Sequence, residues 1–233
     1  MTPPAAPDAP DRFFQIGFSK CGTTAIWAFL NRCGIPCVHY DRGRLARRMR
    51  DNLAAGRRPL EGYDHRYRAF TNMNHNEPDD YFDAFKEYAA LDRAYGGRFI
   101  LNTRPREHWL RSRMSHDARR LRARRLANHR LRFGTDDPAE VADRWRAEWE
   151  EHHRRVVAEI PAERLLVFDI ESDPPERLCD FVGVPRSCAR HWRRENPSMN
   201  AAGRLVGAVV PPAVKRRIPE RLKLPLKRLL RRR

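Results

Sequence analysis

The sequence predicts an α/β fold in which helices pack on a mostly parallel sheet, and three observations lead to this prediction. Short apolar runs of strand length recur along the chain. Segments whose apolar residues repeat at helical spacing lie between them. Hydrophobic residues make up 41% of the 233 positions, which is enough for a substantial core. Apolar strands that alternate with helices are typical of a layered fold with a parallel sheet.

Five runs are predicted to be strands of this sheet. They span residues 12–18, 37–40, 67–71, 98–103 and 164–170. Each is short and apolar, as expected of a strand that is buried on both faces.

Helical patterns fill the intervals between these strands. They cover residues 23–33, the first part of 42–58, residues 78–95, a long basic stretch after 103, a segment from 138, and residues 174–184. In 78–95, Phe82, Phe85 and Ala89 share one face, and the glycines at 96 and 97 end the helix.

Two of the helices carry a clear apolar stripe. In the basic helix the stripe consists of Leu110, Met114, Ala118 and Leu121. The helix from 138 begins with Asp137 as N-cap and Pro138 in its first turn. Its core-facing residues are Val141, Trp145, Trp149, His152 and Val156.

Charge is the unusual feature of the composition. The chain has 47 Lys and Arg against 30 Asp and Glu, a net charge of +17, and only five of the cations are lysines. Part of the arginine bias is typical of a GC-rich genome. The remainder favours an anionic ligand, a nucleic acid or an anionic membrane surface.

The chain has no apolar stretch near the roughly 18 residues that a membrane span needs. Residues 1–10 lack the basic and apolar regions of a signal peptide. We expect a disordered tail at 1–11, one α/β domain at 12–200 and a basic helical tail at 201–233. The odd number of cysteines, without a repeated CxxC, predicts reduced thiols in a cytoplasmic protein and no metal site.

The segment 15–30 is the most informative one, because it places a glycine loop between a strand and a helix. Gly17 and Gly22 keep the G-x4-G spacing of a nucleotide P-loop, but Thr23 stands where the P-loop lysine belongs. The cation of this loop is Lys20 instead. Backbone amides and the helix N-terminus still suit an anion. A triphosphate with Mg²⁺ fits poorly, and a smaller diester-like anion fits better.

This loop resembles the 5′-phosphosulfate loop of sulfotransferases that use 3′-phosphoadenosine 5′-phosphosulfate (PAPS). Lys20, Gly22, Thr23 and Thr24 match the family motif, Cys21 holds its variable position, and Ser19 stands where proline is commoner. The resemblance implies that the loop binds the cofactor through Ser19, Lys20, Cys21, Gly22, Thr23 and Thr24.

A second element of the family pattern follows residues 98–103. Family members end a central strand with an arginine and carry a serine eight residues later, and the pair clamps the 3′-phosphate of PAPS. Arg104 and Ser112 match in type and spacing. A guanidinium at the carboxyl edge of a parallel sheet can hold phosphate through two hydrogen bonds.

The resemblance extends unevenly over residues 12–200. Residues 161–185 resemble the last core strand and following helix of bacterial members, and 42–70 is the thinnest part. The late Arg-Lys-Gly segment of cytosolic animal members is missing here. Arg193, Arg194 or the turn at 196–198 are candidates to replace it.

The resemblance implies a P-loop-like, three-layer α/β/α fold that moves a sulfuryl group from PAPS to a hydroxyl or amine by in-line displacement. The acceptor would be a small molecule, a glycan or a lipid-linked glycan, and no metal is required. Lys20 would neutralise the departing 5′-phosphate.

The family's catalytic base is a histidine or glutamate that the cofactor motifs do not fix. The candidates here are His39 and Asp41 after the second strand, and His75 and Glu77 after the third. We rank His39 first and His75 second. The alternative for either histidine is a polar loop residue without a catalytic role.

Two other classes of function compete with this interpretation. A P-loop kinase or NTPase is suggested by the apolar strand ending at Asp169, and the missing P-loop lysine argues against it. A nucleic-acid-binding protein is suggested by charge alone, and no recognition motif supports it. The basic, leucine-containing tail at 212–233 favours peripheral contact with an anionic membrane, at the inner face if the protein is cytoplasmic.

Overall fold

The computed structural model describes residues 11–77, 80–119, 122–193 and 195 of the chain. All of them belong to the first of the two units, 1–195 and 196–233, into which the chain divides. The tails expected at 1–11 and 201–233 therefore lie outside the described residues, apart from Asp11.

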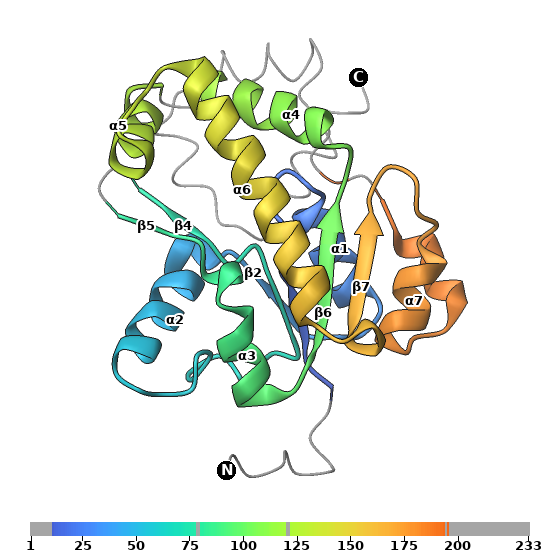
Figure 1. Ribbon diagram of the computed structural model, residues 1–233. Coiled ribbons are helices and arrows are strands. Elements are labelled where there is room, and N and C mark those ends of the chain that lie inside the picture. The colour runs from blue at the N-terminus through green and yellow to red at the C-terminus, as the bar shows by residue number, and fades with distance from the viewer. Residues whose placement is uncertain (1–10, 78–79, 120–121, 194, 196–233) are drawn as a thin grey trace, which may run out of the picture. The chain divides into compact units, whose positions relative to one another are not determined.

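Within the described residues, a five-stranded parallel sheet confirms the predicted α/β fold (Figure 1). Its strands, in the order β2-β3-β1-β6-β7 across the sheet, are Cys37–His39, Ala69–Thr71, Phe13–Gln15, Arg98–Thr103 and Leu165–Asp169. Because all five strands run in the same direction, the segments that follow them meet at one carboxyl edge.

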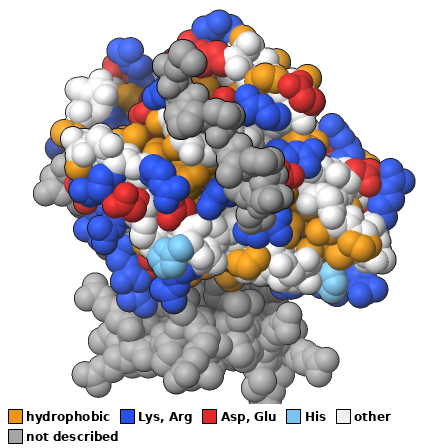
Figure 2. All heavy atoms as spheres, turned by 90° about the horizontal axis from the view of Figure 1, so that it is seen from below, with side chains coloured by type: hydrophobic (Ala, Val, Ile, Leu, Met, Phe, Trp, Pro, Cys, Tyr) orange, Lys and Arg blue, Asp and Glu red, His pale blue; other side chains and the backbone are white. Residues whose placement is uncertain are grey.

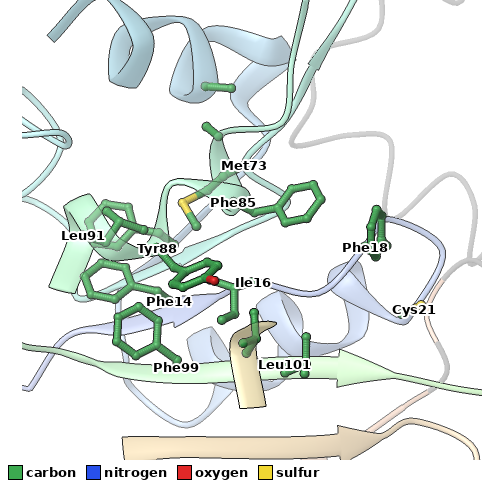
Figure 3. Packing of buried hydrophobic residues seen from close by; sticks show 14 of the residues in the cluster. Phe14, Ile16, Phe18, Cys21, Met73, Phe85, Tyr88, Leu91, Phe99 and Leu101 are labelled. Atoms are coloured by element: carbon green, nitrogen blue, oxygen red, sulfur yellow. The ribbon is translucent and has the colours of Figure 1, made fainter. Parts of the chain in front are cut away.

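Alternate residues of each strand enter two separate apolar clusters, one on each face of the sheet. Phe14 and Phe99 pack on one face, whereas Phe13 and Ile100 pack on the other. Figure 3 shows part of the first cluster, in which Phe14 and Phe99 lie on the same side of the sheet as Tyr88 and Leu91 and close to them. Fully burying side chains of this size stabilises the fold by about 1.5–3 kcal/mol each.

Helices cover both faces and complete the three layers. The first face packs against α2 (Arg44–Ala54), α3 (Tyr88–Tyr95), α4 (Arg106–Arg119) and α6 (Pro138–Glu159). The second packs against α1 (Thr23–Arg32) and α7 (Glu176–Val182). Short 3-10 segments occur at Asp41–Gly43, Ala84–Lys86, Ala162–Arg164 and Arg186–His191.

The helix predicted from residue 138 is confirmed together with its cap. The Asp137 carboxylate accepts hydrogen bonds from the amides of Ala139 and Glu140, and Pro138 follows the cap. The five residues of the predicted stripe are all buried. The basic segment after 103 forms α4 and α5 (Arg122–Phe133), and residues 120–121 between them lie outside the described part of the chain.

The prediction of one helix over 78–95 is wrong in its first part. Residues His75–Asn76 (β4) and Tyr81–Phe82 (β5) pair as an antiparallel hairpin, and the helix α3 begins only at Tyr88. The Phe85 amide donates to the Met73 carbonyl, 3.0 Å away, and is therefore withdrawn from helical bonding. Ala89 is exposed rather than core-facing.

Candidate active site

The glycine loop connects β1 to α1 at the carboxyl edge of the sheet, as the sequence predicts. Gly22 is the N-cap of α1 with φ 73°, no side chain caps the first turn, and that turn holds no acidic residue. The amides at a helix start lack partners within the helix and carry the positive end of its dipole. The loop therefore has the backbone arrangement that binds anions.

The backbone dihedral φ changes sign twice within this loop. Lys20 and Gly22 both have φ near 73°, and Cys21 between them does not have positive φ. Alternation of this kind produces a concave row of amides that suits anions. The Cys21 side chain is fully buried, and this burial raises the pKa of its thiol far above the ordinary value. Cys21 therefore contributes backbone rather than a thiolate.

Asn102 on β6 holds the loop in place, and the sequence reasoning missed it. Its Nδ2 donates to the Cys21 carbonyl at 2.6 Å, and its Oδ1 accepts from the Gly17 amide at 3.0 Å. A Cβ on Gly17 would lie 2.1 Å from the Asn102 carbonyl oxygen, so only glycine fits there. The available signal was an asparagine near the end of an otherwise apolar run, which the structure buries completely.

Two side chains of α4 fix the position of Ser19. Trp109 Nε1 donates to the Ser19 carbonyl at 3.0 Å, and an Arg113 nitrogen lies 3.4 Å from Ser19 Oγ. The Arg113 guanidinium stacks over the ring of Trp145, 4.5 Å from its centroid. Arg113 is thus a further cation beside the loop, and its four-residue spacing from Trp109 was the sequence signal for it.

Arg104 reaches the loop from the end of β6. One terminal nitrogen donates to the Lys20 carbonyl at 3.2 Å, and the other pairs with the Glu171 carboxylate. Arg104 Nε is buried without a hydrogen-bond partner. Ser112 is half-buried on α4, and its hydroxyl makes no side-chain hydrogen bond within the described part of the chain. Arg104 therefore contacts the backbone of Lys20, whereas none of the described side-chain hydrogen bonds joins Ser112 to Arg104.

Glu171 carries a negative charge beside Arg104. Its other carboxylate oxygen lies 2.6 Å from His108 Nδ1. Burial opposes ionisation of this carboxyl group, but the hydrogen bonds from His108 and Arg104 outweigh it and lower the pKa of Glu171.

His39, the first-ranked base, lies beside the loop with a defined tautomer. Thr71 Oγ1 donates to the Val38 carbonyl at 3.1 Å, so its oxygen accepts from His39 Nδ1 at 2.9 Å. His39 Nε2 therefore carries the lone pair, and it lies 3.4 Å from Thr24 Oγ1. Burial lowers the pKa of His39 to about 4, so this imidazole is neutral at pH 7.

His75, the second-ranked base, lies in a different setting. It is buried, and its Nε2 lies 3.1 Å from Asp80 Oδ2, whose carboxylate also pairs with Arg50 of α2. Burial lowers the pKa of His75. Its described hydrogen-bonding and ion-pair contacts belong to the β4–β5 hairpin and not to the loop.

The two acidic candidates have partners of their own. Asp41 accepts hydrogen bonds of 2.6 Å from both Arg44 and Tyr63. Glu77 lies at the hairpin, where its carbonyl accepts from Asn128 Nδ2 at 2.7 Å.

A shallow hollow of about 580 Å³ opens next to the Arg104 side of the site. It is lined by Pro105, Arg106, Glu107, His108, Arg111, Trp149, Glu150 and His153. Over the described ranges, no group of three or more His, Cys, Asp or Glu side chains is arranged to hold a metal ion.

Comparison with known proteins bears on the family of the chain. A family model described as a sulfotransferase domain matches residues 115–202. No curated protein matches the chain. The matched region begins after the glycine loop, Arg104 and Ser112, so it bears on the family and on sulfuryl transfer as its general activity rather than on these residues. Over these residues the chain is similar to a sulfotransferase domain, and the match covers less than half of the chain.

Proposed function

We propose that this protein transfers a sulfuryl group from PAPS to a hydroxyl or amine acceptor, which is a small molecule, a glycan or a lipid-linked glycan. The observation that carries the proposal is the contact between the Arg104 guanidinium and the Lys20 carbonyl. This contact places the phosphate-type loop next to a second cation at the same edge of the sheet. A sulfuryl donor with two separate phosphate groups would need two such cationic sites.

The described residues fit such a donor in charge and shape. The α1 N-terminus and Lys20 would hold one anionic group, and Arg104 has a buried Nε without a hydrogen-bond partner. The Cβ of any residue replacing Gly22 would come within 3.0 Å of Ile170, so the loop also packs closely against the neighbouring strand end.

PAPS, when bound, supplies the sulfuryl group and a 5′-phosphate leaving group. The amides of residues 22–24 and Lys20 would hold the negative charge at the 5′ end. Arg104, with Ser112, would hold the 3′-phosphate. The hydrogen bond from Asn102 to the Cys21 carbonyl would hold the loop in the position that both phosphate contacts need.

His39 is the proposed base. Its Nε2 would take the proton of the acceptor, because Nδ1 is already committed to Thr71. The pKa of about 4 makes it a weak base that is fully neutral at physiological pH. His75 stays the second candidate, on its buried Nδ1 without a hydrogen-bond partner.

Thermal protection tests this function against the kinase alternative. The protein is melted with 3′-phosphoadenosine 5′-phosphate (PAP), with AMP, with ATP and Mg²⁺, and with inorganic sulfate as a control for general anion binding. We expect PAP without metal to raise the melting temperature most. Stronger protection by ATP with Mg²⁺ would support a P-loop kinase or NTPase and contradict the proposal.

A further inference from the structure

The end of β7 places a carboxylate directly against the proposed phosphate clamp. In the sheet register, Thr103 of β6 lies opposite Asp169 of β7, so the residues that follow these strands are neighbours. The Glu171 amide donates to Asp169 Oδ1 at 2.8 Å, which fixes the turn after β7. The Glu171 carboxylate then reaches Arg104 from this turn.

Arg104 is largely enclosed by these partners. Its side chain is 14% exposed and that of Glu171 is 31% exposed. One terminal nitrogen of Arg104 contacts the loop at the Lys20 carbonyl, and the other contacts Glu171. A carboxylate and a phosphate both accept hydrogen bonds from the same paired N–H donors of a guanidinium.

We propose that Glu171 is a built-in competitor for the phosphate that Arg104 binds, and that it sets the affinity of this subsite for nucleotides with a 3′-phosphate. The inference rests on the proposed function, which supplies that phosphate. A bound phosphate takes the Arg104 nitrogen that Glu171 occupies, so the Arg104–Glu171 pair must open before the phosphate binds there. His108, 2.6 Å from the other oxygen of Glu171, keeps the displaced carboxylate paired.

This arrangement has a consequence for turnover. A nucleotide without a 3′-phosphate leaves the Arg104–Glu171 pair intact, so Glu171 does not affect its binding. The product, PAP, does carry a 3′-phosphate. Competition from Glu171 therefore weakens its binding to Arg104 and speeds its release.

Calorimetric titration of PAP and AMP into wild-type and Glu171→Gln protein tests the inference. The matched control is Glu150→Gln, because Glu150 pairs with Arg106 rather than with Arg104. We expect Glu171→Gln to tighten PAP binding about tenfold, the order of effect of freeing one charge-assisted hydrogen-bond donor of Arg104 for the phosphate. AMP binding, and both ligands in the control, should be unchanged. Melting curves of the free variants verify folding.

The double variant Arg104→Ala/Glu171→Gln shows whether the effect passes through Arg104. Relative to Arg104→Ala alone, we expect no gain in PAP affinity. A gain that persists without Arg104, or a Glu171→Gln variant that binds PAP as before or more weakly, would overturn the inference and leave the proposed function intact. A wild-type protein that binds PAP no better than AMP would overturn both.

Discussion

His39 is held as a neutral imidazole with its lone pair directed at the loop, and Thr71 is the residue that enforces this state. The Thr71 hydroxyl can accept from His39 Nδ1 because its own proton goes to the Val38 carbonyl. Thr71 is therefore a positioning residue. Replacing it by valine keeps the shape but removes the acceptor.

For Thr71→Val we predict that His39 loses its preference for the Nδ1-protonated tautomer. ¹⁵N chemical shifts of the His39 ring measure this directly, with a His39→Gln spectrum to assign the signals. The rate of sulfuryl transfer should fall together with the tautomer population, and Thr71→Ser should restore both. An unchanged tautomer in Thr71→Val would show that Thr71 has no such role.

Lys20 is the cation predicted to act on the leaving group. Lys20→Ala should lower turnover by about 10²–10³-fold, comparable to losing an oxyanion-hole donor, while PAP affinity falls much less. The measurement is PAP formation from PAPS with the best acceptor from a screen of phenols, amines and glycans.

Lys86→Ala is the matched control for Lys20. The Lys86 ammonium lies 5.6 Å from the ring centroid of Phe18 in the loop, but it pairs with Asp83 and Glu148. Its loss should leave turnover unchanged. Normal turnover by Lys20→Ala would remove Lys20 from the mechanism.

At the scale of elements, β6 both builds the sheet and holds the loop. Asn102 satisfies buried backbone groups of the loop that otherwise have no partner on the strand. Asn102→Ala should therefore lower the free energy of unfolding by about 2–4 kcal/mol, since several buried polar groups lose their partner. It should also weaken PAP binding.

Asn128→Ala is the control for that effect. Asn128 is equally buried, but its amide bonds to the Glu77 carbonyl at the hairpin. Denaturant unfolding should show a loss of stability in both variants, and calorimetry a loss of PAP affinity only in Asn102→Ala. Equal PAP affinity in the two variants would mean that Asn102 does not organise the loop.

The strands, most of the helices and the glycine loop follow from local patterns in the sequence, because apolar periodicity and glycine spacing are local properties. The β4–β5 hairpin does not follow from a local pattern. The two ends of this segment are joined by a bond from the Phe85 amide to the Met73 carbonyl. Asn102 and Glu171 act across the sheet, on partners about 80 and 67 residues away. A single sequence does not identify the distant partners of such residues.

At the scale of the whole molecule, several of the described arginines form ion pairs with acidic residues nearby in the sequence. Arg44, Arg146 and Arg154 each form an ion pair with an acidic residue three positions away. Figure 2 shows basic side chains spread over one face with acidic and apolar side chains between them. Exposed pairs of this kind contribute little to stability, because water and salt screen their attraction. The helices in the described part of the chain include none that is long and apolar enough to cross a membrane.

The basic segment 212–233 lies outside the described residues, and its membrane contact stays a prediction. It holds ten Lys and Arg with leucines between them. Each cation near an anionic leaflet contributes about 1 kcal/mol, within a Debye length. We predict that the full chain co-sediments with anionic vesicles at low salt and that a chain ending at Gly207 does so weakly. Equal sedimentation with a lower melting temperature after truncation would mean that the segment packs on the domain.

The central claim is that Arg104 and the glycine loop together recognise a nucleotide with a 3′-phosphate. Calorimetry of PAP and AMP, without metal, on wild-type protein, Arg104→Ala and the neighbouring control Arg106→Ala tests it most directly. We predict that wild-type protein binds PAP far more tightly than AMP, and that Arg104→Ala alone loses about 2–4 kcal/mol of PAP affinity, the cost of removing one partner of a charge-assisted pair. Equal affinity of the wild-type protein for PAP and AMP would contradict the claim.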